Sequence, residues 1–181
     1  GERNAIKPNQ NNPKRSTCRK VKIKIIQDKA HPAYGERGLF AATTIKPKTH
    51  ILDYVGLIRN EMSESKSSDY IIAFTQGLSI DAERRGNEAR FINDFRGTRN
   101  EQNVKFENYS KDNGIRLGVF AMNKPIRKGQ ELLVSYGRSF WKARGLFEEM
   151  SQVSSSLQSS TSSSRAQPEE RKKKKNKRVR R

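Results

Sequence analysis

Short apolar runs separated by turn residues are the feature that most restricts how this chain can fold. The runs are rich in Val, Ile, Tyr and Phe and are bounded by Gly, Pro, Asn and Asp, which is the pattern of short β-strands. No long helical repeats alternate with them, so the pattern favours a mainly β domain over a parallel α/β sheet. The predicted strands cover residues 21–27, 38–45, 49–58, 69–74, 78–82, 103–109, 115–122 and 131–137.

Two hairpins and two short helices complete this prediction. Gln76-Gly77 and Asp112-Asn113-Gly114 each separate two strand-like runs, which is a hairpin signal. Apolar residues have helical spacing in 139–150, where Ser139 is a candidate N-cap, and a shorter helical piece is expected at 87–93. The expected fold class is therefore mainly β with few short helices.

Basic charge is concentrated at the two ends of the chain. The 181 residues carry 38 Lys and Arg against 19 Asp and Glu, a formal charge of +19. Residues 1–24 contribute +7 (eight basic, one acidic) and residues 151–181 contribute +8 (ten basic, two acidic), whereas residues 25–150 contribute +4 (20 basic, 16 acidic). Hydrophobic residues make up 32%, below the roughly 45–50% of an ordinary domain. We therefore expect one folded domain, residues 21–150, between disordered segments at 1–20 and 151–181.

The C-terminal segment divides into a serine-rich part and a basic tail. The serine-rich part has too little apolar surface to offset the entropy of ordering it, so we expect a flexible linker. Nine of the eleven residues in 171–181 are Lys or Arg. Such a run is typical of a nuclear address or of a nucleic-acid contact, and the alternative is a solvated tail without a partner.

Cysteine, histidine and hydropathy patterns exclude several classes of site. Cys18 is the sole cysteine, which excludes a disulfide framework and a multi-cysteine zinc site within this sequence. No run approaches the ~18 apolar residues of a membrane-spanning helix, so no membrane contact is expected. His31 and His50 lie near turns without the spacing of metal ligands. We therefore expect both to be exposed and no metal to be bound.

Four segments, taken in order, resemble the SET domain of protein lysine methyltransferases. They are residues 34–45, 52–58 together with 69–74, 80–95 and 116–137. The specific signal is the order of IDA, GNEARFIN, VFA, Gly-x-Glu-Leu and a final Ser-Tyr-Gly. The resemblance implies a fold of small β-sheets with a C-terminal pseudoknot. The Cys-rich segments that flank the domain in many members are absent here, so the final helix would have to close the site.

What the resemblance implies is methyl transfer from S-adenosylmethionine to a lysine ε-amine, without a metal. The amine must be neutral to attack, and an apolar channel that desolvates the ammonium lowers its pKa. Tyr136 of Ser-Tyr-Gly and Tyr54 match the family's catalytic and channel tyrosines, although each also suits a packed strand residue. Val134 and Phe140 are the expected substrate-channel residues, and the small Val134 favours transfer of more than one methyl.

The resemblance also implies a cofactor site, with two departures from the family pattern. Glu36 stands where a glycine is usual, and Asp94 replaces a histidine. Arg90 either supports the cofactor carboxylate or pairs with a nearby acid, and Trp141 either covers the adenine or packs the final helix. The implied cofactor-binding residues are Gly35, Glu36, Arg37, Gly38, Tyr70, Arg90, Asn93, Asp94 and Trp141.

Three functional hypotheses follow. The first is a nuclear lysine methyltransferase acting on a histone tail or another nuclear protein, with Asp69, Glu83 and Glu107 as candidate acids along the substrate groove. The second is a SET-like scaffold associated with chromatin, in which the two departures have removed turnover. The third is a nucleic-acid binder whose basic ends carry the function through salt-sensitive phosphate contacts.

Overall fold

The fold is seen in a computed structural model, which describes residues 18–60 and 68–145. Residues 1–17 and 151–181 of the predicted tails lie outside this range, as do residues 146–150 of the predicted final helix. The elements in chain order are β1 (Val21–Ile25), β2 (Arg37–Ala41), β3 (His50–Asp53), β4 (Leu57–Asn60), β5 (Ile71–Thr75), β6 (Leu78–Asp81), the 3-10 helix η2 (Glu88–Phe91), β7 (Asn93–Asp94), β8 (Val104–Lys111), β9 (Gly114–Ala121), β10 (Leu133–Val134) and α1 (Arg138–Ala143).

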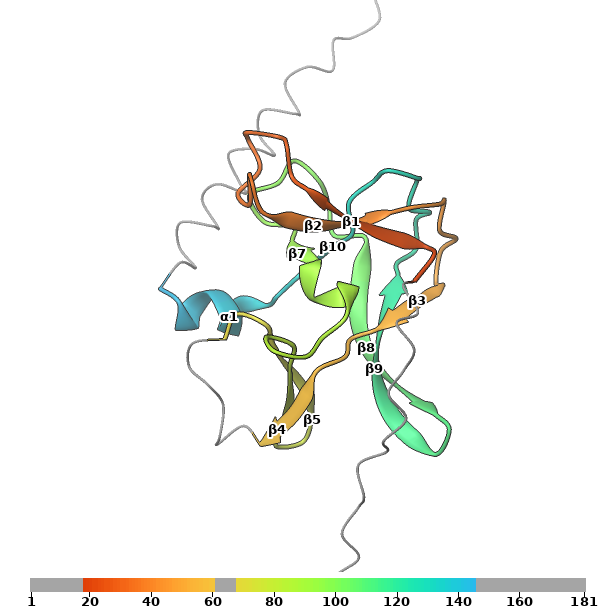
Figure 1. The fold of residues 1–181 in the computed structure, drawn as a ribbon, viewed down its shortest axis with the longest axis vertical. Coiled ribbons are helices and arrows are strands. Elements are labelled where there is room, and N and C mark those ends of the chain that lie inside the picture. Colours follow the sequence, from red (N-terminus) through yellow and green to blue (C-terminus); the bar gives the residue numbers. More distant parts are fainter. Residues whose placement is uncertain (1–17, 61–67, 146–181) are drawn as a thin grey trace, which may run out of the picture.

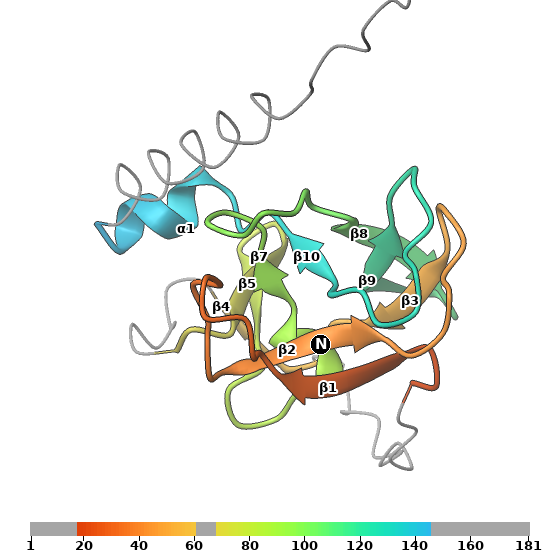
Figure 2. The ribbon, with the colours of Figure 1, turned by 90° about the horizontal axis from the view of Figure 1, so that it is seen from above.

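Four small β-sheets are formed by the described residues, which confirms the predicted mainly β class. β1 pairs with β2, two antiparallel three-stranded sheets have the orders β3–β9–β8 and β4–β6–β5, and β7 pairs with β10. Figure 1 shows the β1–β2 pair above the two larger sheets, with α1 on the side away from β8 and β9. Figure 2 shows β7 and β10 near the middle of the molecule, where segments from several sheets converge.

Both predicted hairpins are present, and their turn residues have the positive φ values that these turns require. β8 and β9 pair from Val104 to Lys111, and Asp112 and Asn113 form the turn with φ values of 50° and 60°. Two successive positive φ values match the right-handed twist of a hairpin and are tolerated best by Asn, Asp and Gly. Between β5 and β6, Gly77 has a φ of 72°. The local sequence therefore fixes the register of both hairpins.

The long predicted strand at 49–58 is divided into β3 and β4, which belong to different sheets. Gly56 lies at this crossing, where a Cβ atom would come within 2.5 Å of the Asp81 carbonyl oxygen. Only a glycine lets the backbone approach β6 so closely. The division matters for the site because Tyr54 lies directly between the two strands.

The parallel pair β7–β10 is the element that the sequence did not predict. The Phe95 amide donates to the Val134 carbonyl at 2.9 Å, and the Asn103 amide donates to the Leu133 carbonyl at 2.9 Å. The chain near Leu133 is therefore held by both ends of the loop between Phe95 and Asn103. This pairing places Tyr136, two residues after β10, against the hydrophobic core.

One hydrophobic core joins the sheets. Buried residues come from every layer, and partly buried aromatic residues, including Tyr70, Phe106 and Tyr136, pack against them. Among the described residues, no helix is long and apolar enough to cross a membrane. The core residues with the least exposure are Leu39, Ala41, Ala82, Val104, Val119, Ile126 and Leu132.

Cys18 and Lys20 belong to the folded part, although both fall in the stretch predicted to be disordered. The Cys18 thiol donates to the Ile51 carbonyl at 3.3 Å, and Lys20 Nζ donates to the His50 carbonyl at 2.7 Å. The ordered domain therefore begins before β1, because these side chains reach β3 across the sheet boundary.

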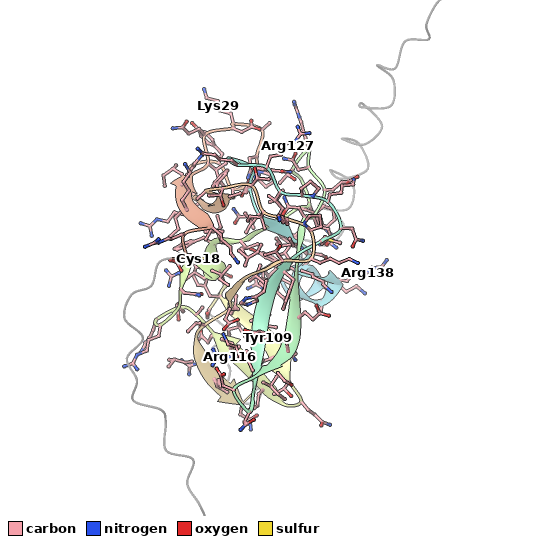
Figure 3. The ribbon with its side chains drawn as sticks, turned by 90° about the vertical axis from the view of Figure 1, so that its right-hand side faces the viewer. Cys18, Lys29, Tyr109, Arg116, Arg127 and Arg138 are labelled. Carbon is pink, nitrogen blue, oxygen red and sulfur yellow. The ribbon has the colours of Figure 1, made fainter. Side chains whose placement is uncertain are left out.

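A polar cluster surrounds Asp53 on the β3–β9–β8 sheet. Tyr109 Oη donates to Asp53 Oδ1 at 2.7 Å, His50 Nε2 lies 2.8 Å from the same oxygen, and Arg116 Nη1 lies 3.4 Å from Oδ2. Figure 3 shows Tyr109 and Arg116 near each other on this sheet. Burial acts to raise the pKa of Asp53, but the hydrogen bonds from Tyr109 and His50 and the nearby positive charge outweigh it, so the pKa lies below its usual value.

Asp53→Asn is expected to remove part of the acid sensitivity of the fold. Because the native pKa lies below the unfolded value of about 3.9, ionised Asp53 contributes stability above that pH and loses it as the pH falls through the native pKa. We expect the variant to be less stable than the wild type by about 1–3 kcal/mol at pH 7, with the gap narrowing at pH 3. Urea denaturation at the two pH values measures this difference in the free energy of unfolding.

Asp112→Asn is the matched control for this prediction. Its side chain is 70% exposed and pairs with the same Arg116 at 3.0 Å. An exposed pair contributes little, so this variant should stay within about 1 kcal/mol of the wild type at both pH values. A gap between Asp53→Asn and the wild type that is equally wide at pH 7 and pH 3 would contradict the argument.

Candidate functional site

Two adjoining cavities share one wall, to which Tyr136 contributes. The smaller has a volume of about 80 Å³ and is lined mainly by aromatic and aliphatic side chains. The larger has a volume of about 470 Å³ and carries charged groups of both signs. The residues common to both are Asp69, Tyr70, Arg90, Tyr136 and Phe140.

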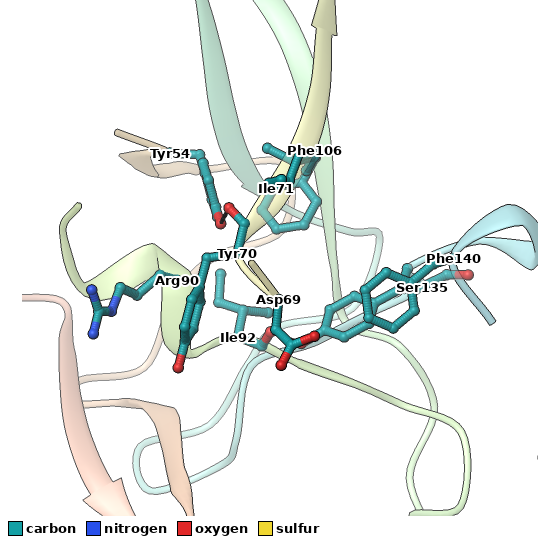
Figure 4. Close-up of a pocket in the computed structure, with 11 residues that line it drawn as sticks. Tyr54, Asp69, Tyr70, Ile71, Arg90, Ile92, Phe106, Ser135 and Phe140 are labelled. Atoms are coloured by element: carbon teal, nitrogen blue, oxygen red, sulfur yellow. Dashed lines mark hydrogen bonds between the residues drawn. The ribbon is translucent and has the colours of Figure 1, made fainter. Parts of the chain in front are cut away.

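The smaller cavity is a narrow apolar space between β5, η2 and the segment after β10. Figure 4 shows Tyr54 and Phe106 at one end of it, and Asp69 and Phe140 toward the other. A long side chain without branches suits such a space, and an ammonium group inside it would lose hydration. The lining residues are Tyr54, Asp69, Tyr70, Ile71, Ile72, Arg90, Ile92, Phe106, Ser135, Tyr136 and Phe140.

Tyr136 is fixed at both its backbone and its side chain. Its hydroxyl donates to the Ile92 carbonyl at 2.7 Å, and its amide donates to Asp94 Oδ2 at 2.6 Å. Its ring contacts Phe140 edge-on, with centroids 4.7 Å apart, and is stacked with Trp141 at 6.2 Å. Burial raises the pKa of Tyr136 far above its usual value, and the charge of Asp94 adds to this. The phenol therefore keeps its proton at neutral pH.

Tyr54 faces the same cavity from the crossing between β3 and β4. Its hydroxyl donates to the Tyr70 carbonyl at 2.9 Å, and its ring meets Phe106 edge-on at 5.5 Å. Burial raises the pKa of Tyr54 as well, with a further contribution from the charge of Asp81. Two protonated phenols thus border one small apolar space, as expected for a site that orients an uncharged polar group.

Arg90 projects from η2 and lines both cavities. Its Nη1 donates to the Ala82 carbonyl at 3.0 Å and the Glu83 carbonyl at 2.9 Å, and its guanidinium lies 4.8 Å from the centroid of the Tyr70 ring. Within the described ranges, no carboxylate pairs with it, so the alternative of an ion pair with a nearby acid is not seen. Its buried Nε has no hydrogen-bond partner among the described residues.

Asp94 lies behind the wall that both cavities share and does not line either of them. Besides the Tyr136 amide, its carboxylate accepts hydrogen bonds from Arg96 Nη1 at 3.0 Å and Trp141 Nε1 at 3.3 Å. Its side chain is 4% exposed. Asp94 and Trp141 therefore contact each other and Tyr136, and neither lines these two cavities.

Val134 and Gly38 also lie outside the lining of the two cavities. Val134 is buried in the core, and Ser135 and Phe106 stand at the wall of the smaller cavity. The inference that Val134 sets the number of methyls therefore has no support in this structure. A Cβ at Gly38 would lie 2.7 Å from Glu131 Oε1, so Gly38 makes room for that carboxylate.

Phe106 lines the smaller cavity but was not predicted as a site residue. Its sequence surroundings show only an ordinary strand pattern, which does not distinguish it from other strand residues.

The larger cavity suits a ligand that carries both positive and negative groups. Glu36 and Asp69 supply carboxylates, and Arg37 and Arg90 supply guanidinium groups. Its volume falls within the ~300–1,000 Å³ usual for small-molecule sites. Of the three acids expected along the groove, Asp69 lines both cavities, whereas Glu83 and Glu107 line neither. The sequence-predicted residues that line the larger cavity are Gly35, Glu36, Arg37, Tyr70, Arg90, Asn93, Tyr136 and Phe140.

The prediction that both histidines are exposed is wrong for His31, whose side chain is only 7% exposed. It is buried against Glu131 because the loop before β2 folds back onto the segment before β10. His50 is half-buried, with a side chain that is 37% exposed, so it too is less exposed than predicted. In the part of the chain that the structure covers, no cluster of His, Cys, Asp and Glu could hold a metal ion.

Comparison with protein families matches residues 36–137 to the SET domain. The chain is 28% identical over 109 residues to "Histone-lysine N-methyltransferase, H3 lysine-36 specific" of Aspergillus fumigatus, a match covering 55% of this chain and 11% of that protein. It is 26% identical over 125 residues to "Histone-lysine N-methyltransferase ASHH3" of Arabidopsis thaliana, covering 64% of this chain and 32% of that protein. The matched region thus spans at most about a third of either relative.

A solved structure supports the fold independently. The Polycomb repressive complex 2 of Chaetomium thermophilum contains a chain that superposes with a TM-score of 0.53 at 24% identity. The superposition covers 65% of this chain and 15% of that one. At this level of identity the likeness concerns the fold alone.

Proposed function

This chain belongs to the SET-domain family, and from that premise we propose that it transfers a methyl group from S-adenosylmethionine to the ε-amine of a protein lysine. The observation that carries the proposal is the position of Tyr136, which borders both cavities. A narrow apolar cavity for an amine and a larger charged cavity for a cofactor meet at this one phenol. In an in-line displacement, the amine attacks the methyl carbon from the side opposite the sulfur. The amine and the cofactor must therefore meet from two sides, as the two cavities do at Tyr136.

In this proposal the larger cavity holds the cofactor. When bound, S-adenosylmethionine supplies a methyl group on a positively charged sulfur. Arg90 and Arg37 line this cavity and are suited to the cofactor carboxylate, whereas Glu36 and Asp69 are suited to its positive groups. Glu36 is therefore compatible with binding, although it stands where glycine is usual. Asn93 completes the wall.

The smaller cavity prepares the lysine. An ε-amine with a usual pKa of about 10.4 is almost fully protonated at neutral pH, and desolvation among Ile92, Phe106 and Phe140 favours the neutral form. The proton leaves to solvent before transfer, because both phenols already hold theirs. Tyr136 and Tyr54 then orient the neutral amine by hydrogen bonding, which positions its lone pair toward the larger cavity.

We further propose that the substrate is a histone or another nuclear protein and that the protein acts in the nucleus. Two kinds of observation support this: the relatives are histone-lysine methyltransferases by name, and the basic run 171–181 resembles a nuclear address. The same run is suited to contact nucleic acid. A chromatin-associated scaffold without turnover is the second candidate, because Glu36 and Asp94 depart from the family pattern.

The test combines cofactor binding and methyl transfer with the full chain. We expect S-adenosylmethionine to bind in the micromolar range by titration calorimetry. We also expect transfer of its tritium-labelled methyl group to core histones, with mass spectrometry locating the modified lysine. Histones whose tails have been removed by trypsin are the control and should accept no label. If the folded protein binds no S-adenosylmethionine up to millimolar concentration, the proposed methyltransferase activity is wrong. The chromatin-associated scaffold is then the favoured function.

A further inference from the structure

We propose that His31 and Glu131 are positioning residues that hold the wall of the larger cavity in the shape that binds the cofactor. The proposal rests on the function proposed above and extends it to two residues that line neither cavity. The observation that supports this proposal is a buried series of polar contacts. It runs from the loop before β2, through His31 and Glu131, to Asn93 on β7.

Glu131 connects directly to the wall. Its Oε1 accepts a hydrogen bond from Asn93 Nδ2 at 3.0 Å, and Asn93 lines the larger cavity. Asn93 Nδ2 also approaches the Arg37 carbonyl at 3.3 Å. The Glu131 carboxylate therefore decides the orientation of an amide that touches both β7 and β2.

His31 connects the same carboxylate to the loop. Its Nδ1 accepts a hydrogen bond from the Ala33 amide at 3.0 Å, which places the proton of the neutral ring on Nε2. That Nε2 lies 3.3 Å from Glu131 Oε2, which is within ion-pair distance but outside hydrogen-bond geometry, and it makes no hydrogen bond in the described chain. Ala33 and the following Gly35 line the larger cavity. The His31–Glu131 contact, called the anchor below, therefore connects the loop before β2 to Asn93 on β7.

The anchor is buried and tightly enclosed. The side chains of His31 and Glu131 are 7% and 9% exposed. On the side of β2, Gly38 leaves room for the carboxylate, since a Cβ there would lie 2.7 Å from Oε1. A buried carboxylate that loses one of its few partners is costly, so the neighbouring backbone must move when either residue is removed. The parts in direct contact with the anchor, and so the first to shift, are the segment that carries Ala33 and the side chain of Asn93.

The test compares His31→Ala and Glu131→Gln with His50→Ala in the full chain. His50 is the matched control because it also pairs with a carboxylate, that of Asp53, but lies outside both cavities. We expect both site variants to raise the dissociation constant of S-adenosylmethionine about tenfold, which corresponds to about 1.4 kcal/mol. The maximal transfer rate at saturating cofactor and the KM for histone should change less than twofold. His50→Ala should lose thermal stability and leave cofactor affinity unchanged.

The double variant His31→Ala/Glu131→Gln separates a shared anchor from two independent effects. If the two residues act through one contact, the double variant should bind the cofactor no more weakly than the worse single variant. Additive losses, or an equal loss of affinity in His50→Ala, would overturn the proposal. Affinity that matches the wild type in folded site variants would overturn it too.

Hydrogen exchange gives a measure that does not depend on methyl transfer. The Gly35 amide donates to the Ile26 carbonyl and the Glu36 amide to the Ala33 carbonyl, each at 3.0 Å, so both report loop opening. We expect faster exchange at both amides in His31→Ala and no change in His50→Ala. If the wild type binds no cofactor, the proposed function fails, yet faster exchange still supports the anchor. Unchanged exchange in His31→Ala would reject the anchor by itself.

Discussion

Replacing Tyr136 by Phe is expected to lower the maximal rate of methyl transfer by about 10²–10³-fold, the loss typical when one positioned hydrogen-bonding group is removed from an active site. The phenol borders both cavities, and its ring packing with Phe140 and Trp141 does not need the hydroxyl. Loss of the hydrogen bond to the Ile92 carbonyl should cost about 1 kcal/mol of stability. The variant should therefore stay folded and bind S-adenosylmethionine with near wild-type affinity.

Tyr109→Phe is the matched control for this substitution. Tyr109 donates its hydroxyl to Asp53 at 2.7 Å on the β3–β9–β8 sheet, and it lines neither cavity. We expect Tyr109→Phe to reduce stability but to retain the transfer rate within about twofold. Label transfer at saturating cofactor and histone measures both variants. A Tyr136→Phe protein with a wild-type rate would show that the reaction does not use this phenol.

Asp94→Ala is expected to destabilise the fold by about 3–5 kcal/mol, because it removes the acceptor of one buried network. The Tyr136 amide, the Trp141 indole and the Arg96 guanidinium would all lose their partner. Urea denaturation at neutral pH measures the loss. Since the same carboxylate holds the backbone of Tyr136, the remaining folded protein should also transfer methyl groups more slowly.

Asp94→Asn separates the charge of this residue from its role as an acceptor. The amide keeps one oxygen, so it can still accept from the Tyr136 amide, but it loses the ion pair with Arg96 at 3.0 Å. We expect a smaller loss of stability than for Asp94→Ala and a transfer rate closer to the wild type. If both variants were as stable as the wild type, Asp94 would not be the support of Tyr136 that its contacts indicate.

Much of the site was predictable because the residues lie in local motifs. The Ser-Tyr-Gly motif marked Tyr136, and the GNEARFIN segment marked Arg90 and Asn93, all of which line the larger cavity. The acid Asp69 was named as a groove residue and lines both cavities. Phe106 was not predictable from its own surroundings. Its strand pattern is that of any half-buried aromatic residue, and only the packing of β8 against Tyr54 brings it to the cavity.

The prediction for the final helix was confirmed only in part. α1 begins at Arg138, close to the expected start, and Phe140 lines both cavities. Trp141 instead stacks on Tyr136 and donates to Asp94. Helical spacing predicts that neighbouring aromatic residues face different directions, but it does not show which direction meets a cavity and which meets the core.

What the sequence by itself determined is the set of short strands, the two hairpins and the order of the site motifs. Each depends on neighbours a few residues apart, whose turn geometry and alternating pattern act locally. The tertiary structure alone decided the β7–β10 pair, the support of Tyr136 by Asp94 and the burial of His31 against Glu131. Those contacts join segments some 40 to 100 residues apart, and a buried carboxylate takes its role from the donors that the fold brings to it.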